Sequence, residues 1–360
     1  MKVLLVEDSE VVIKYVQHVL ASEPDIELLP PARDGAAGVE AALRLAPDVI
    51  LMDLGLPVLD GIAAITEIMR THPTPIVVLS GRLDSPSVDR TFESLAAGAV
   101  DVLAKPAGLG IANVDGFRAR LVRTLRVMAQ ACVVARGRKL PVDRTAPPET
   151  DWPETDWEAL QEAGREAGRP LPRSPQIVLI GTSTGGPQLL DRLLRALPAP
   201  FPLPIVIAQH IMVGFEDGLA RWLAESGHQV EVVRAPRPIE AGRVYLAPAD
   251  RHLAVTARGF TLRDAGVTLP VPSADVLFGS AAEAVGAGVV ALLLTGMGAD
   301  GAEGLLALRQ AGARTIAQAG ETCVVDGMPQ AARRRGAACE VLGPEEMIRM
   351  LLRVGSDSRS

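Results

Sequence analysis

Short apolar runs alternate with helical patterns along the first third of the chain. Four runs are typical of buried strands: KVLLVE (2–7), DVILMD (48–53), PIVVLS (75–80) and VDVLAKP (100–106). Residues 9–21 have helical spacing, and so do residues 117–135. In the second segment one apolar face is formed by Leu121, Leu125, Met128 and Cys132. This alternation predicts a parallel, doubly wound sheet.

The same alternation starts again in the second half of the chain. Further strands are predicted at residues 176–181, 204–210, 243–248, 252–257, 288–296 and 314–319. Amphipathic helices separate most of them, for example PQLLDRLLRAL at residues 187–197. The predicted fold class is therefore α/β, with two doubly wound parallel-sheet domains.

The stretch between these two patterns has a different composition. From Pro141 to Arg173 it is rich in Pro, Glu and Asp, and the tetrapeptide ETDW occurs twice around Pro153. Such a composition favours an extended linker. Trp152 and Trp157 leave open that the linker docks on a surface. The predicted boundaries are a first domain at 1–115, a helix and linker at 116–173, and a second domain at 174–354.

Composition and charge narrow the class of protein. The 360 residues carry a net charge of -7, and this argues against a nucleic acid or an anionic membrane as the main partner. Three cysteines without metal-ligand spacing fit a reducing compartment. The start of the chain is not a signal peptide, and no run reaches the ~18 apolar residues of a membrane span. We expect a cytoplasmic protein without membrane insertion.

Charged side chains follow the strands of the first domain. Glu7 and Asp8 end the first strand, Asp53 ends the 48–53 strand, and Lys105 follows the 100–106 run. The carboxyl ends of such strands share one crevice, where three carboxylates repel each other unless a cation lies among them. Mg²⁺ prefers oxygen ligands of this kind. With Lys105 and the hydroxyl of Ser80, the site can accept a phosphoryl group on Asp53.

These residues resemble a response-regulator receiver domain over residues 1 to about 110. The stretches VEDS, MDLGLPVLDG, Ser80 and KP carry the resemblance. It implies phosphorylation of Asp53 by a histidine kinase, Mg²⁺ as cofactor, and a switch formed by Ser80 and Lys105. Two positions depart from the family: Glu7 replaces a commoner Asp, and Val102 stands where an aromatic switch residue is usual.

The second domain opens with IGTSTGGP at residues 180–187. Its GTSTG matches the G-x-S-x-G pattern between strand and helix, which exposes a nucleophilic serine. Ser183 needs a base and an orienting carboxylate. His210 ends a strand and is the best-placed histidine, while His252 is a weaker candidate. Asp300 follows another strand end in a glycine-rich loop, whose N–H groups suit an oxyanion hole.

Two alternatives for the serine turn are weaker. Its glycines at 181, 185 and 186 match neither G-x-G-x-x-G nor a G-K-[ST] phosphate loop. The order Ser, His, Asp differs from that of the α/β-hydrolases, in which the histidine comes last.

From about residue 175 to 352 the chain resembles the catalytic domain of the CheB protein-glutamate methylesterases. The stretches that carry the resemblance are IGTSTGGP, AQHIMVGF, VYLAPADRHL, PSADVLF, LTGMGADGA and TCVVDGMP. It implies a Rossmann-like domain with Ser183 as nucleophile, His210 as general base and Asp300 as its orienter. The backbone at Thr184 and Met297 would bind the oxyanion. HIMVGF lacks prolines common in the family, and Val271 replaces a frequent arginine.

Together the resemblances imply a phosphorylation-activated esterase of sensory adaptation. It would hydrolyse glutamate γ-methyl esters on chemoreceptors to glutamate and methanol, without a cofactor, and deamidate receptor glutamines with the same triad. The alternative from another class is a receiver fused to a binding module without activity. A DNA-binding output is disfavoured because the second half lacks a basic stripe.

Overall fold

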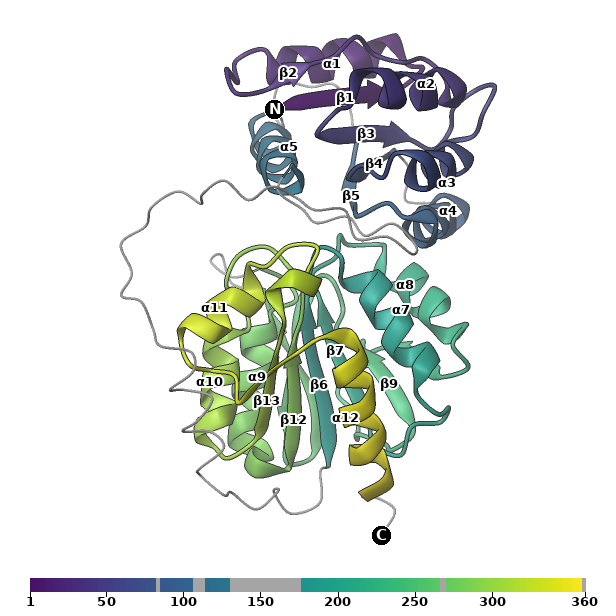
Figure 1. Cartoon of the computed structure of the whole chain (residues 1–360). Helices are drawn as coiled ribbons and strands as arrows, with labels where there is room; N and C mark the ends of the chain where they lie inside the picture. The colour runs from purple at the N-terminus through teal and green to yellow at the C-terminus, as the bar shows by residue number, and fades with distance from the viewer. Residues whose placement is uncertain (82–84, 106–113, 130–175, 266–269, 358–360) are drawn as a thin grey trace. The chain divides into compact units, whose positions relative to one another are not determined.

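The computed structural model describes residues 1–81, 85–105, 114–129, 176–265 and 270–357 (Figure 1). The chain divides into two compact units, Met1–Val142 and Asp143–Ser360. The predicted linker, with Trp152 and Trp157, lies outside the described residues, so its docking stays untested. The domain boundaries given above likewise stay a prediction.

The first unit is a five-stranded parallel sheet with the order β2-β1-β3-β4-β5. Its strands are β1 (Lys2–Val6), β2 (Glu27–Leu28), β3 (Val49–Asp53), β4 (Ile76–Ser80) and β5 (Asp101–Ala104). Its helices are α1 (Glu10–Leu20), α2 (Gly35–Leu45), α3 (Gly61–Thr71), α4 (Ser85–Ala97) and α5 (Val114–Met128). The doubly wound sheet predicted for this half is confirmed.

Apolar strands and capped helices explain this local structure. Residues of β3 and β4 are almost all buried, because helices cover both faces of a parallel sheet. Asp34 and Asp60 begin α2 and α3, and each side chain accepts a hydrogen bond from a backbone N–H of the first turn. The helix predicted at 117–135 begins earlier, at Val114, and Cys132 lies outside the described residues.

The second unit is built on a seven-stranded parallel sheet with the order β14-β13-β12-β6-β7-β9-β8. Its strands are β6 (Ile177–Thr182), β7 (Ile205–Gln209), β8 (Gln229–Val232), β9 (Arg243–Leu246), β12 (Val289–Leu293), β13 (Arg314–Gln318) and β14 (Glu340–Leu342). Its helices are α7 (Gly186–Ala196), α8 (Glu216–Ala224), α9 (Ala274–Ala284), α10 (Ala302–Gln310), α11 (Met328–Arg334) and α12 (Pro344–Asp357).

Helices cover both faces of this sheet (Figure 1). α9, α10 and α11 lie on one face, and α7, α8 and α12 lie on the other. On the first face Leu179 of β6 packs in one core with Phe278 of α9 and Leu305 of α10. The arrangement confirms a doubly wound sheet in the second half as well.

One predicted strand belongs elsewhere. The run at 252–257 forms β10 (Arg251–Thr256), which pairs antiparallel with β11 (Gly259–Asp264) in a separate two-stranded sheet. Phe260 of β11 packs edge-on against Tyr245 of β9, with ring centroids 4.8 Å apart. The strand predicted at 252–257 is confirmed, but it lies outside the parallel sheet, because an antiparallel pair needs only the short turn between its strands.

Candidate active site

The three residues predicted to form a triad follow neighbouring strands of the seven-stranded sheet. Ser183 and His210 come directly after β6 and β7, and Asp300 lies in the loop between β12 and α10. The chain runs from β6 outward through β7 and later returns to β12 on the other side of β6. The crevice at such a switch point is the usual ligand site of an open α/β sheet.

The turn that carries Ser183 is held by close backbone packing. The Ser183 N–H donates to Thr295 O (3.0 Å), and its carbonyl accepts from the Gly186 N–H (2.9 Å). Gly185 has a positive φ of 77°, and a Cβ there would lie 2.6 Å from Cβ of Val324. A Cβ on Gly186 would collide with the Gln209 amide. These glycines are thus required by backbone conformation and packing, whether or not an anion binds.

His210 and Asp300 meet in a short hydrogen bond. His210 Nε2 lies 2.7 Å from Asp300 Oδ2. The Asp300 side chain is buried, whereas the ring of His210 is partly exposed. The other ring nitrogen of His210, Nδ1, has no hydrogen-bond partner among the described residues. With Asp300 accepting from Nε2–H, Nδ1 carries the lone pair that can accept a proton.

The pKa of Asp300 reflects these contacts. Burial favours the neutral acid, but hydrogen bonds from His210, Ser273 and the Ala274 N–H outweigh burial and lower the pKa of Asp300 below its ordinary value. The pKa of the nearby Asp275 shifts in the opposite direction. Burial raises it, and the charge of Asp300 adds to this effect, despite a hydrogen bond from the Gly304 N–H. Asp300 is therefore the carboxylate of the site.

Two residues that sequence reasoning did not single out also contact the three side chains or their backbone. Gln209 Nε2 donates to the carbonyls of Ser183 (2.8 Å) and His210 (2.9 Å). Ser273 Oγ donates to Asp300 Oδ1 (2.6 Å). Both lie in stretches that resemble the family, AQHIMVGF and PSADVLF, and this was the available signal. Their roles depend on contacts between separate segments, which spacing along the chain does not reveal.

The loop before Asp300 lies against the Ser183 turn. A Cβ on Gly296 would lie 2.6 Å from the Cβ of Ser183, so the two backbones touch. The Met297 N–H donates to no oxygen among the described residues, while Thr184 is buried in the same turn. An N–H of this kind beside a nucleophile can stabilise a developing oxyanion.

A second loop supports the Gly296 backbone. The N–H groups of Gly327 and Met328 donate to Gly296 O at 3.1 and 2.9 Å. Arg333 of α11 forms an ion pair with Asp326 (2.5 Å) and donates to Gln318 O (2.8 Å), so its side chain is directed toward this loop, whereas Arg334 and Arg335 are exposed.

The other histidines of this unit are buried and structural in their contacts. His228 is buried, with Nε2 3.1 Å from Leu194 O. His252 Nδ1 accepts from the Ser273 N–H (3.1 Å). Burial lowers the pKa of His252 below its ordinary value, and Arg263 adds to this effect while Asp300 opposes it. Within the described part of the chain, neither ring forms a hydrogen bond with Ser183.

The first unit gathers its acids at its own switch point, between β1 and β3. One oxygen of each of Glu7, Asp8 and Asp53 lies within 4.8 Å of the others, which is close enough to share a metal ion. Glu7 is fully buried, Asp53 is partly exposed and Asp8 is exposed. A hard cation could thus be held on the protein side while water completes its coordination. The structure brings together the acids predicted for Mg²⁺.

Lys105 lies between two of these acids. Its Nζ is 2.7 Å from Glu7 Oε2 and 3.0 Å from Asp53 Oδ1. Burial and the charge of Asp53 raise the pKa of Glu7, although Lys105 opposes them. For Lys105 burial is outweighed by the two acids, so its pKa is raised and it stays charged. Ser80 is buried at the end of β4, and its carbonyl accepts from the Lys105 N–H (2.7 Å).

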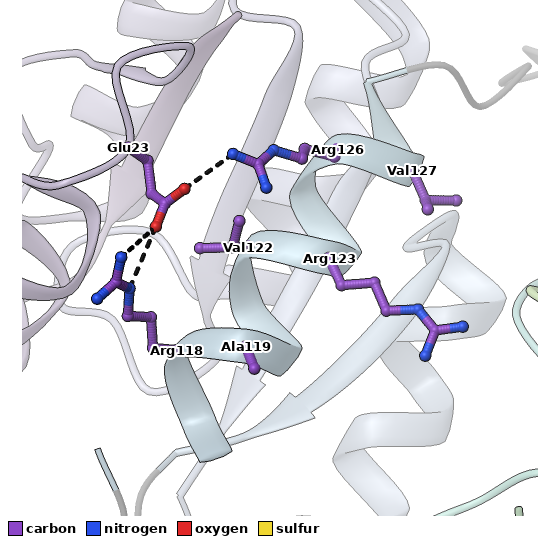
Figure 2. Close-up of a pocket in the computed structure, with 7 residues that line it drawn as sticks. All are labelled: Glu23, Arg118, Ala119, Val122, Arg123, Arg126 and Val127. Atoms are coloured by element: carbon purple, nitrogen blue, oxygen red, sulfur yellow. Dashed lines mark hydrogen bonds and ion pairs between the residues drawn. The ribbon is translucent and has the colours of Figure 1, made fainter. Parts of the chain in front are cut away.

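A separate groove lies on the first unit (Figure 2). Its volume is about 520 Å³, and Glu23 in it binds both Arg118 and Arg126 of α5. It is lined by Glu23, Arg118, Ala119, Val122, Arg123, Arg126 and Val127. None of the predicted site residues lines it.

Among the described helices, none has the length and apolar character needed to cross a membrane.

Comparisons with known proteins bear on both units. A family model described as CheB methylesterase matches residues 178–351, and a model described as response regulator receiver domain matches residues 3–110. A protein named protein-glutamate methylesterase/protein-glutamine glutaminase 3 from Anaeromyxobacter dehalogenans is 40% identical over 96% of both chains. Another, numbered 4, from Geobacter metallireducens, is 40% identical over 97% of both chains. The crystallised catalytic domain of Thermotoga maritima CheB methylesterase is 36% identical and covers 51% of this chain and 100% of its own, with a TM-score of 0.49.

Proposed function

Because this chain belongs to the CheB methylesterase family, we propose that Ser183, His210 and Asp300 are the catalytic triad of its esterase. The chain is a methylesterase with a receiver domain, and it acts in chemotactic adaptation under control of phosphorylation. The observation that carries the assignment of the triad is the 2.7 Å hydrogen bond between His210 and Asp300. This bond lies at the switch point of the sheet, where the turn with Ser183 leads from β6 into α7.

For this triad we expect the following steps. Ser183 Oγ attacks the ester carbonyl carbon, and His210 Nδ1 takes its proton. Asp300, held as a carboxylate, stabilises the resulting imidazolium. The N–H groups of Thr184 and Met297 bind the oxyanion. Collapse breaks the bond to the methoxy group, which leaves as methanol with the proton from His210.

Water completes the reaction. His210 takes a proton from a water molecule, whose oxygen attacks the acyl-enzyme carbonyl, and the bond to Ser183 Oγ then breaks. Ser183 regains its proton, and the product is a glutamate. A glutamine side chain would follow the same path with ammonia as the leaving group. The substrate we propose is a methylated glutamate on the cytoplasmic domain of a chemoreceptor, so the protein would work in the cytoplasm.

The first unit would receive the signal. A histidine kinase would donate its phosphoryl group to an Asp53 oxygen, and the Lys105 ammonium, 3.0 Å from Asp53, would pair with the added charge. Glu7, Asp8 and Asp53 would hold Mg²⁺, which supplies positive charge for the transfer. Ser80 at the adjacent strand end would offer its hydroxyl to the phosphorylated state. Val102 has no aromatic ring, so the conformational response to phosphorylation would depend on Ser80 and Lys105.

The test is methanol release from methylated receptor membranes, measured with and without a small phosphodonor. We expect release that rises with phosphodonor, a loss of that rise in Asp53→Asn, and almost no release by Ser183→Ala. Ser226→Ala is the matched control, because Leu223 O is the one partner of its hydroxyl within the described residues. Full release by Ser183→Ala would refute the triad, whereas receptor binding with no release by the unmodified chain would favour a binding module.

A further inference from the structure

The carboxylate of Asp300 is bound on both oxygens by the start of α9. Oδ2 accepts from the Ala274 N–H (2.7 Å) in addition to His210 Nε2. Oδ1 accepts from Ser273 Oγ (2.6 Å) and from the Asp275 N–H (3.2 Å). A carboxylate that accepts four such bonds has no freedom to rotate without losing several of them.

Ser273 occupies a special place among these donors. It is the N-cap of α9, and its Oγ accepts from the Val276 N–H (3.3 Å) while donating to Asp300. Its own N–H donates to His252 Nδ1 (3.1 Å). Its side chain is 1% exposed, so water cannot replace the hydroxyl without rearrangement. The hydroxyl is therefore oriented from both sides, with its proton directed at Asp300.

We propose that Ser273 is a positioning residue of the esterase, which fixes the plane of the Asp300 carboxylate and through it the ring of His210. This inference rests on the triad proposed above. The reason is geometric. The terminal torsion of an aspartate is broad and roughly two-fold, so a bond to one oxygen leaves its plane loosely defined. Bonds to both oxygens define it, and Ser273 Oγ makes the shorter of the two bonds to Oδ1, at 2.6 Å against 3.2 Å for the Asp275 N–H.

The consequence concerns the rate of the chemical step. The bond from His210 Nε2 to Asp300 Oδ2 fixes the orientation of the ring, and with it the direction in which Nδ1 can accept a proton. Displacements of about 1 Å from the reactive geometry can lower rates by about 100-fold. A looser carboxylate would therefore slow proton transfer from Ser183 without changing the surface that binds the receptor.

The experiment compares three serine variants in the full-length protein. Ser273→Ala removes the hydroxyl, and we expect kcat for methanol release to fall by about 10- to 100-fold, with KM within about two-fold. Ser273→Thr keeps the hydroxyl and should restore most of kcat. Ser280→Ala is the matched control, because Ser280 is a buried serine of the same helix that bonds to Val255 N and Leu277 O but not to Asp300.

Loss of the N-cap is separated from loss of the contact with Asp300 by Ser273→Gly. Replacement of a capping serine by glycine costs only a few tenths of a kcal/mol of helix stability, so this variant should fold as well as the unmodified chain and be slowed as much as Ser273→Ala. A proton NMR readout adds a direct view of the site: the downfield signal of the His210–Asp300 proton should persist in Ser280→Ala and broaden in Ser273→Ala and Ser273→Gly.

The outcomes distinguish this inference from the proposed triad. If Ser183→Ala and Asp300→Asn are inactive while folded Ser273→Ala and Ser273→Gly keep kcat within two-fold, Ser273 has no positioning role and the triad stands. Equal losses in Ser273→Ala and Ser280→Ala would assign the effect to α9 in general and overturn the inference. If Asp300→Asn itself keeps full activity, the triad is wrong.

Discussion

The two crevices of this chain lie at the same place in the same kind of sheet, yet they are built from different interactions. In the first unit Glu7, Asp8 and Asp53 gather around one ammonium, that of Lys105. In the second unit one buried carboxylate, Asp300, is surrounded by hydrogen-bond donors. Topology thus places a site, whereas the side chains at the strand ends decide its chemistry.

The difference fits what we propose for each crevice. A metal ion and a phosphoryl group would bind and leave the first one, so their oxygen ligands would need to remain accessible, as the exposed Asp8 is. A triad must instead keep one geometry through many turnovers, so its carboxylate gains from being buried and fully hydrogen-bonded. Accessible charge therefore suits the receiver crevice, and fixed neutral donors suit the esterase crevice.

The largest effect that separates the crevices is expected from the nucleophile and its base. Ser183→Ala and His210→Ala should each lower methanol release by at least about 10³-fold, and the double variant should be little worse, because the two act as a unit. Labelling of Asp53 by a phosphodonor should be unchanged in all three. The two sites would not be separable if Ser183→Ala also abolished labelling.

The placement of these residues could be predicted because each follows an apolar run, and parallel strands bring such ends together. Glu7, Asp53, Ser183 and His210 were found in this way. Four strands were not predicted from the sequence, because their residues are too few or too exposed to give a clear pattern: β2, β8, β11 and β14.

The contacts of Ser273 and Gln209 could not be predicted from the sequence for another reason. Ser273 meets Asp300 27 residues further along the chain, and Gln209 meets the Ser183 carbonyl 26 residues earlier. Such contacts exist only once helices and strands have packed. Periodicity describes which face of an element is buried, but not which distant backbone group a polar side chain reaches.

An amide-to-acid exchange tests whether the esterase crevice depends on neutral hydrogen-bond donors. Gln209→Glu replaces the Nε2 donor with an oxygen that faces the carbonyls of Ser183 and His210. The two carbonyls, which are partly buried, would lose this donor, at a cost near the lower end of about 1–3 kcal/mol. We expect lower resistance of the second unit to heat and reduced kcat. Gln229→Glu, on an exposed side chain of β8, is the control. Unchanged stability of Gln209→Glu would mean that the bridge contributes little.

The reverse exchange should have a smaller and opposite effect in the receiver crevice. Glu7→Gln removes a buried charge whose pKa is raised, chiefly by burial. Without metal, the first unit should therefore become slightly more resistant to heat, by roughly a few degrees at most. Mg²⁺ affinity should fall, because one anionic ligand is lost. Calorimetry with and without Mg²⁺ measures both effects. A less stable metal-free variant would show that the Glu7–Lys105 pair, rather than repulsion and burial, dominates.

The smallest expected effect concerns pH and the histidine behind Ser273. Burial lowers the pKa of His252 in the folded chain below that of the unfolded chain, about 6.5. Between these two pKa values the unfolded chain binds the extra proton and the folded chain does not, so stability decreases as pH falls below about 6.5 and is fully present above it. Protonation of Nδ1 would also break the bond from the Ser273 N–H.

NMR titration of the His252 ring should therefore give a pKa below 6.5, with Asp300 and Arg263 as the charged groups acting on it. Hydrogen exchange adds a local measurement. Beyond the intrinsic effect of pH, protection of the Ser273 N–H should weaken on acidification, whereas that of the Val255 N–H, which donates to Ser280 Oγ, should not. In His252→Gln the extra pH dependence should vanish, because the amide oxygen can accept the bond without titrating. A measured His252 pKa at or above 6.5 would mean that the charge of Asp300 outweighs burial. This result would contradict the prediction.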